Sequence, residues 1–556
     1  MARAPGDEAV RFGERANAVL GPLPYLLAIG AVLAAEFSWV RATNFGGVDE
    51  WLYLSLNSRG IVAFPHSNRP LTLIWSQPAV WLAPYSFHGY FLLHAAYLAL
   101  GAGLVVLICR RLTADPGLAL LAGVFAAAWA PLDMARLAAV QTSMNSGVLL
   151  GTLLALLLLI VSWERARVPA LAAGCLMGLV AARSYEAVLA LLLGAPVLLL
   201  FVRSGLPGRA ARAAWLVAWE ASAVLALVLA ALPLLAKQAE SAYQTEVLGL
   251  DLAPARYLGR FLRQYALHLG PLVPADPREL LHPGVAAAAA LFAASWWILG
   301  LVRPVEEPRE PPSRLAALAG LGLALAGLGY AVLVASPQVQ GATRTQFLAA
   351  PGVALFLAAS LVLTASALPP RIRGAALLLG GAGVVAVGTG HTIAMQREWD
   401  RISYYDAQVS TLRQLTGAAP DLTPNTLVLL RDETRAWPYS FSFRHAVSYL
   451  YQGKAVGYAL GANPLLYSLA ATPEGIWSVP WPVIEKPWRT APTLHRYDEV
   501  VAFRRDASGR LFLLEGWDET GLPPLPAGAH YDPRPRIELG KRPPPERRVL
   551  DAPGVR

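Results

Sequence analysis

The sequence has little charge for its length. Only 15% of its 556 residues are Asp, Glu, Lys or Arg, and 55% are hydrophobic, whereas about 25% charged residues is usual in soluble domains. The mean hydropathy of +0.45 averages apolar stretches long enough to cross a bilayer with a more polar last quarter. This composition excludes a soluble, disordered or collagen-like chain and predicts a polytopic membrane protein.

Cysteine and lysine are also scarce. The two cysteines, Cys109 and Cys175, lie in apolar segments, so we expect buried packing residues and no disulfide framework. The net charge of +9 comes almost wholly from arginine, which is spread over loops and tail. We therefore expect no nucleic-acid partner.

Several catalytic motifs are missing. The chain has no GxxxxGK[ST], no HExxH, no paired CxxC and no Gly-x-Ser-x-Gly. ATP-driven transport, zinc proteolysis and serine-hydrolase chemistry therefore have no support.

Apolar windows bounded by charge or proline predict about 11 membrane-spanning helices. They lie at 18–40, 87–110, 117–134, 145–163, 168–184, 186–203, 213–236, 284–302, 314–336, 345–366 and 373–394. The short loops on the side of the N-terminus are all basic, whereas the long loops 41–86 and 237–283 are far less so, which places the long loops outside. We expect a multi-pass protein of a bacterial inner (cytoplasmic) membrane.

Three domains are predicted. Residues 1–395 form the transmembrane domain, with interfacial helices in the first outer loop (41–86). Residues 396–520 form a small α/β domain with a strand at 426–430 and a hairpin at 500–514, and 521–556 form a Pro- and Arg-rich irregular tail. Because the helix count is odd, the α/β domain lies outside.

The first outer loop carries candidate chemistry. Asp49 and Glu50 are adjacent acids near a partly desolvated interface, where a carboxylate has a raised pKa and suits a general base or a divalent cation such as Mg²⁺ or Mn²⁺. Simple solvation at a helix end is the alternative. Further along the loop, His66 precedes Arg69, which is either an anion ligand or a cation that snorkels to lipid headgroups.

Other ionisable residues fall on the same predicted side. Arg183, Tyr185 and Glu186 occupy a turn between two apolar segments, where charged groups are usually functional or mutually paired, here as an Arg183–Glu186 staple. Arg344 begins another helix, and its guanidinium suits phosphate oxygens or a lipid headgroup. Tyr265 and His268 either complete a substrate cavity or are ordinary interfacial residues.

These residues, in this order, resemble the GT-C superfamily of integral-membrane glycosyltransferases that use polyprenyl-phosphate-linked sugars, particularly the protein O-mannosyltransferases and their bacterial relatives. The resemblance covers about residues 18–395. It rests on Asp49-Glu50, Arg69-Pro70-Leu71-Thr72, Ala130-Pro131, Arg183 to Glu186, and Arg344 with Phe347-Leu348 and Pro351-Gly352. Asp133 stands where these relatives carry a histidine, and no tetratricopeptide array follows, so a protein acceptor is not implied.

The resemblance implies a fold and a reaction. An inverting transfer would move a sugar from a polyprenyl-phosphate donor to a hydroxyl of a glycan, lipid or protein acceptor at the extracytoplasmic face. Asp49 would be the general base, and Glu50 would assist it or bind the acceptor or a metal. Arg344, with Arg183 and Arg69, would bind the donor phosphate. The residues expected to line the substrate cavity are Tyr185, Glu186, Asp133, His66, Tyr265 and His268.

Other classes stay open. A lipid-linked glycan flippase would need a polar path through the bilayer, with ionisable residues in mid-helix, and the predicted helix interiors carry almost none. A non-catalytic cell-surface assembly protein is a further alternative. A ligase or polymerase of the O-antigen type would share the donor lipid and an outer arginine-bearing loop.

Overall fold

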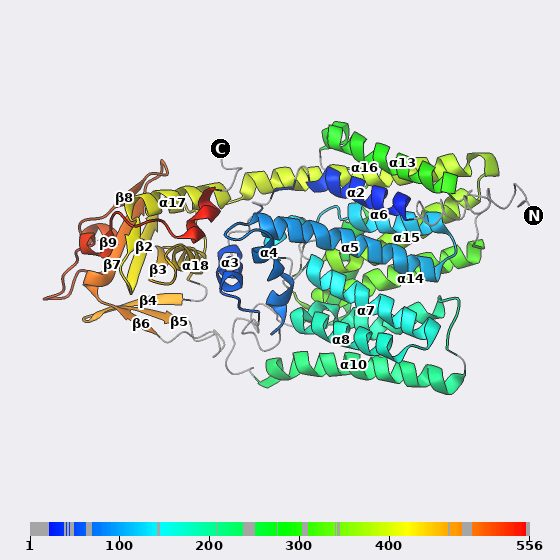
Figure 1. Cartoon of the computed structure of the whole chain (residues 1–556), viewed down its shortest axis with the longest axis horizontal. Coiled ribbons are helices and arrows are strands. Elements are labelled where there is room, and N and C mark those ends of the chain that lie inside the picture. The colour runs from blue at the N-terminus through cyan, green and yellow to red at the C-terminus, as the bar shows by residue number, and fades with distance from the viewer. Residues whose placement is uncertain are drawn as a thin grey trace, which may run out of the picture.

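The computed structural model describes residues 22–551, apart from segments at 38–39, 42–43, 45–48, 63–68, 142–144, 207, 237–250, 275, 303–309, 338, 340, 342–344, 465–466 and 481–491. Figure 1 shows a helical body at one end and a mixed α/β domain at the other. The long helix α16 (Pro370–Ile402) leaves the helical body and leads directly to α17 (Tyr405–Ala418) of the α/β domain.

Each predicted span coincides with a helix or a helical run. These are α2 (Leu23–Phe37), α5 (His88–Leu112), α6 (Pro116–Ala128), α7 (Ser146–Arg165), α8 (Val168–Ser184), the run η4 (Glu186–Val188), α9 (Leu189–Gly194) and η5 (Ala195–Leu200), α10 (Arg209–Ala236), α13 (Pro283–Val302), α14 (Pro312–Ala331), α15 (Gln346–Ser366) and α16. Within the described residues, seven helices are long and apolar enough to cross a membrane, and four shorter apolar helical segments accompany them. The chain is a polytopic α-helical membrane protein.

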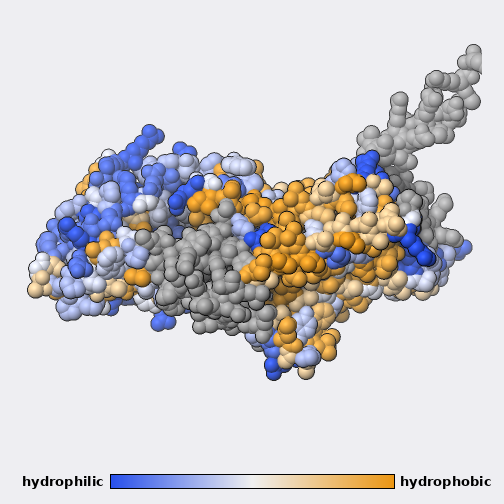
Figure 2. Space-filling model, turned by 90° about the horizontal axis from the view of Figure 1, so that it is seen from below, coloured by the Kyte–Doolittle hydropathy of each residue, from blue (hydrophilic) through white to orange (hydrophobic). Residues whose placement is uncertain are grey.

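The surface of the helical body is apolar. Figure 2 shows hydrophobic residues over its visible face and hydrophilic residues over much of the α/β domain. Leu200, Val217 and Leu379 are each more than two-thirds exposed. Leucine and valine so exposed are compatible with a hydrocarbon solvent, which also requires the backbone groups to be bonded within helices.

Salt bridges gather at the end of the helical body away from the α/β domain. The buried carboxylate of Glu310 pairs with Arg203 and Arg314, and Arg111 lies 2.6 Å from Glu164. Arg314 also donates to the carbonyl of Leu112 at 3.0 Å. The loops predicted to be basic therefore meet one another at one end.

Short interfacial elements occupy the opposite end. They are α3 (Glu50–Ser58), η1 (Thr72–Trp75), α4 (Pro78–Leu82), η2 (Met134–Leu137), η3 (Ala139–Gln141), α12 (Pro254–Leu269) and η6 (Pro277–Leu281). Helix α3 lies in the loop for which the sequence predicts interfacial helices, and helix α18 (Ser440–Leu450) of the α/β domain packs against it. Every residue of α3 from Glu50 to Asn57 is buried, because both of its sides pack against protein.

A four-stranded sheet organises the α/β domain. Its order is β3 (Ala455–Leu460), β2 (Thr426–Asp432), β7 (Val500–Arg505) and β8 (Leu511–Leu513), and β2 runs parallel to β3 and β7. β7 and β8 form the predicted antiparallel hairpin. Val428 and Leu430 pack in the same core as α17 and α18, whereas Leu427 and Leu429 pack on the other face with Ile476.

A second sheet and the C-terminal segment complete this domain. β4 (Tyr467–Thr472), β5 (Gly475–Pro480) and β6 (Thr493–His495) form an antiparallel sheet. β9 (Ile537–Glu538) pairs with β1 (Asp421–Leu422), and η12 (Pro545–Asp551) buries Val549 and Leu550. The described part of the predicted irregular tail therefore packs onto the α/β domain.

Glycines allow α14 and α15 to approach closely. A Cβ atom at Gly322 would lie 2.5 Å from the backbone nitrogen of Phe356, and one at Gly352 would lie 2.4 Å from that of Ala326. Small residues at a helix interface are the usual means of close packing in membranes.

We expect Gly322→Ala to destabilise the protein by about 1–3 kcal/mol, because the added methyl group meets backbone and must push the helices apart. Gly320, on the same helix, is the matched control, since nothing lies within 4 Å of its Cβ position. The unfolding temperature in detergent should be lower for Gly322→Ala than for the wild type, and it should be unchanged for Gly320→Ala. Equal values for the two variants would contradict the close approach.

Candidate functional site

The two adjacent acids lie at the start of α3. Asp49 is the N-cap residue and is partly buried, whereas Glu50 is the first helical residue and is only 1% exposed. The backbone N–H of Tyr53 donates to the carbonyl of Asp49 at 2.9 Å, so the helix begins directly at the acids. Of the two carboxylates, that of Asp49 is the more accessible.

Arg69 and Glu186 form the central ion pair of this end of the molecule. Nε of Arg69 donates to Oε2 of Glu186 at 2.6 Å, and Nη2 donates to Oε1. Burial alone lowers the pKa of Arg69, but Glu186 outweighs burial and holds that pKa above its ordinary value. The bidentate geometry joins the first outer loop to the turn after α8.

Tyr185 extends this ion pair towards α15. Cζ of Arg69 lies 4.8 Å from the centroid of the Tyr185 ring, within the range of a cation–π contact. The same ring stacks on Phe347, with the centroids 6.3 Å apart. Tyr185 is 8% exposed, so it acts as a packed bridge between Arg69 and the first turn of α15.

Asp133 caps α15 from a distant part of the chain. Its Oδ2 accepts the backbone N–H of Gln346 at 2.9 Å and that of Phe347 at 3.2 Å. The first N–H groups of a helix lack partners within the helix. A negative charge there is also attracted to the positive end of the helix dipole. Asp133, which is fully buried, therefore positions the residues that follow Arg344.

Arg183 contacts another helix. Its Nη1 donates to the carbonyl of Leu229 in α10, whereas the carboxylate of Glu186 pairs with Arg69. The carbonyl of Arg183 accepts the N–H of Leu71 at 3.2 Å, and Thr72 donates to the carbonyl of Ser184 at 3.0 Å. The end of α8 thereby holds the Arg69-Pro70-Leu71-Thr72 segment.

Tyr265 and His268 are packing residues of α12. The Tyr265 hydroxyl donates to the carbonyl of Leu323 at 2.6 Å. His268 lies 2.6 Å from the Tyr330 hydroxyl and is fully buried. Burial, together with a smaller effect of nearby Arg136, lowers the pKa of His268 to about 3, so the imidazole is neutral at ordinary pH. These hydrogen bonds anchor α12 to the neighbouring helix α14.

Two predicted residues, His66 and Arg344, lie outside the described residues. The residues after Arg344 are held firmly: Thr345 donates to Gln264 at 2.7 Å, and the side chain of Gln346 donates to the carbonyl of Leu267 at 3.1 Å. Arg344 thus directly precedes a helix start that is fixed by Asp133 and α12.

The structure adds residues that sequence reasoning missed. Arg136 is 5% exposed, and its electrostatic effect reaches His268. Tyr53 interacts electrostatically with Arg69, and it shares a helix face with Asp49 because residues four apart lie above one another. Arg136 could have been noticed as a second ionisable residue three positions after Asp133, but no sequence signal pointed to Tyr53.

A metal site is not evident from side-chain clustering. Within the described residues, no group of three or more His, Cys, Asp or Glu side chains could hold a metal ion. Mg²⁺ commonly binds through one or two carboxylates and keeps several waters. Asp49 with Glu50 would be such a minimal donor set.

We expect Glu186→Leu to destabilise the protein by on the order of 3 kcal/mol, because it leaves the Arg69 guanidinium in a largely buried site without its carboxylate. The double variant Arg69→Met/Glu186→Leu should recover most of that loss, since it removes both charges. Unfolding temperatures of the two variants and the wild type measure the difference. A double variant as unstable as the single one would argue against the ion pair.

The comparisons with known proteins find similarity among solved structures only, and that similarity is distant. No protein-family model matches the chain, and no curated protein matches it in sequence. The crystal structure of ArnT from Cupriavidus metallidurans bound to undecaprenyl phosphate aligns with 78% of this chain and 85% of its own, at 15% sequence identity and a TM-score of 0.37. Similarity at this level transfers no residue role to this chain.

Proposed function

We propose that the protein is an inverting glycosyltransferase that moves a sugar from a polyprenyl-phosphate-linked donor to a hydroxyl acceptor. The reaction would take place at the outer face of a bacterial cytoplasmic membrane. The proposal names the donor class and leaves the sugar and the acceptor open.

One observation carries the proposal: carboxylates and a guanidinium from separate segments meet at the end of the helical body next to the α/β domain. Asp49 begins α3, Tyr53 of the same helix neighbours Arg69, and Arg69 pairs with Glu186. Through Tyr185 and Phe347 these contacts reach the start of α15, which follows Arg344. A general base and phosphate ligands are the two groups that this transfer requires.

The chemistry balances with these groups alone. Asp49 accepts the proton of the acceptor hydroxyl as its oxygen attacks the anomeric carbon. The bond from that carbon to the phosphate oxygen breaks, and its electron pair leaves with the polyprenyl phosphate, so the configuration inverts. Arg344, aided by Arg183 and Arg69, stabilises the departing phosphate through charge-assisted hydrogen bonds.

The membrane position suits a lipid-linked donor. Figure 2 shows an apolar surface on the helical body, and in this proposal that surface would lie against the polyprenyl chain and the bilayer. Asp133 and Tyr185 would line the substrate cavity and hold α15, and Glu50 would bind the acceptor or share a divalent cation with Asp49.

We expect Asp49→Asn to abolish sugar release from radiolabelled polyprenyl-phosphate monosaccharides while donor binding persists, because the amide cannot accept the proton. Asp406 is an exposed acid in the first turn of α17. Asp406→Asn is the control, and we expect this variant to release sugar at the wild-type rate. Each assay is run with and without Mg²⁺ or Mn²⁺. Unchanged turnover in Asp49→Asn would remove Asp49 as the base, and an inactive but folded wild type would favour a flippase or an assembly protein.

We expect Arg344→Ala to weaken donor capture by 100-fold or more, on the order of 3 kcal/mol for a charge-assisted phosphate contact. Arg344→Lys should lose less affinity for the donor than Arg344→Ala. Lysine keeps the positive charge but lacks the planar pair of donors that the guanidinium presents to a phosphate. Binding of the polyprenyl phosphate without its sugar is measured for both. Near-normal affinity in Arg344→Ala would remove the phosphate role.

A further inference from the structure

Two glutamines hold the chain on either side of the adjacent acids. Upstream, the side-chain amides of Gln396 and Asn44 exchange two hydrogen bonds: Asn44 Nδ2 donates to Gln396 Oε1 at 2.8 Å, and Gln396 Nε2 donates to Asn44 Oδ1 at 2.9 Å. Gln396 Oε1 also accepts the backbone N–H of Arg41 at 3.1 Å. Both amide side chains belong to buried residues.

Downstream, Gln408 holds the first turn of α3. Its Oε1 accepts the indole N–H of Trp51 at 3.1 Å, and its Nε2 donates to the carbonyl of Ala436 at 3.0 Å. Gln408 and Trp51 are fully buried. Phe87 packs edge-to-face against both Trp51 and Tyr405, the first residue of α17. Trp51 is therefore fixed one residue after Glu50.

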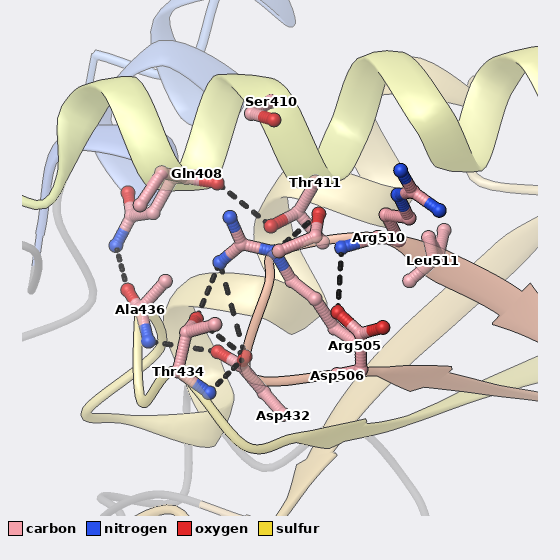
Figure 3. Close-up of polar contacts among 12 residues, drawn as sticks. Gln408, Ser410, Thr411, Asp432, Thr434, Ala436, Arg505, Asp506, Arg510 and Leu511 are labelled. Atoms are coloured by element: carbon pink, nitrogen blue, oxygen red, sulfur yellow. Dashed lines mark hydrogen bonds and ion pairs between the residues drawn. The ribbon is translucent and has the colours of Figure 1, made fainter.

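The far side of Gln408 is itself rigidly bonded. Figure 3 shows Gln408 pointing from α17 to Ala436, with Thr434, Asp432 and Arg505 beyond it. Asp432 accepts the N–H of Ala436 at 2.7 Å and that of Thr434 at 3.0 Å, and Arg505 Nη1 lies 3.8 Å from Oδ1 of Asp432. Asp432 and Arg505 end the parallel strands β2 and β7, so the sheet anchors this network.

We propose that Gln396 and Gln408 are positioning residues, through which α16 and α17 set the place of Asp49 and Glu50. This inference rests on the proposed function. Asn44 precedes the acids in the sequence and Trp51 follows them. Asn44 and Trp51 are held by two helices that form one continuous connection into the α/β domain. The α/β domain thereby controls the geometry of the chemistry without touching substrate.

The chain offers a matched control on the same helix. Gln414 of α17 is also hydrogen-bonded, donating to the carbonyl of Gly509 at 2.8 Å and accepting the N–H of Leu511 at 2.9 Å, with two longer contacts to Ser410. These contacts stay within the α/β domain and are remote in sequence from α3. Gln414→Leu thus removes at least as many hydrogen bonds from α17 as Gln408→Leu does, and it leaves Trp51 bonded.

Turnover separates positioning from stability. Full-length Gln408→Leu and Trp51→Phe should each lower kcat by about 10-fold with the donor KM within about twofold, since a misplacement of about 1 Å can cost up to 100-fold in rate. The double variant should be no slower than either single one, because both remove the same hydrogen bond. Gln396→Leu should also lower kcat. Gln414→Leu should keep it even where its unfolding temperature falls.

A labelling measurement reads the position of the acids without turnover. In a Cys109→Ala/Cys175→Ala background, Asp49→Cys is labelled with a water-soluble maleimide. Adding Gln408→Leu should change the labelling rate at least threefold, and adding Gln414→Leu should not. An equal rate with Gln408→Leu, or an equal loss of kcat with Gln414→Leu, overturns the positioning role. An inactive wild type with the expected labelling change would refute only the proposed function.

Discussion

The ion pair between Arg69 and Glu186 is the contact on which the arrangement of the helical body next to the α/β domain depends. It joins a loop between the first two spans to the turn after α8, two segments 117 positions apart in the sequence. A bidentate guanidinium–carboxylate contact in a largely buried place tolerates little change in geometry. Tyr185 contacts both Arg69 and Phe347 of α15. The loop that carries Arg69, the turn after α8 and the start of α15 are therefore joined by side-chain contacts.

Buried polar groups in this region are paired in ways that specify the fold. Asp133 satisfies two N–H groups of a helix that begins 213 positions later, and Trp129 donates to the carbonyl of His268 at 2.8 Å. Near a bilayer, an unpaired backbone group has little water to bond with, so each such contact decides where a helix can begin. Hydrogen bonds to Gln264, Asp133 and Leu267 likewise fix the positions of Thr345 and Gln346, which follow Arg344 in the sequence.

The α/β domain is continuous with the membrane body and does not hang from a flexible linker. α16 runs from the bilayer region to Ile402, and α17 begins three residues later. α18 covers α3, and Gln408 reaches from α17 to Trp51. The acids at the start of α3 therefore lie next to a residue whose position is set by a folded domain, which is the usual requirement for precise positioning on a loop.

The sequence by itself determined the class of protein and the places of the apolar helical segments, because hydrophobic length is a local property of the chain. It also singled out Asp49, Arg69 and Glu186 as residues at the rim. The tertiary structure alone decided that Glu186 pairs with Arg69, that Asp133 caps α15, and that α3 lies beneath α18. Each of these contacts joins residues far apart in the chain, and no local pattern records which distant partner a side chain will meet.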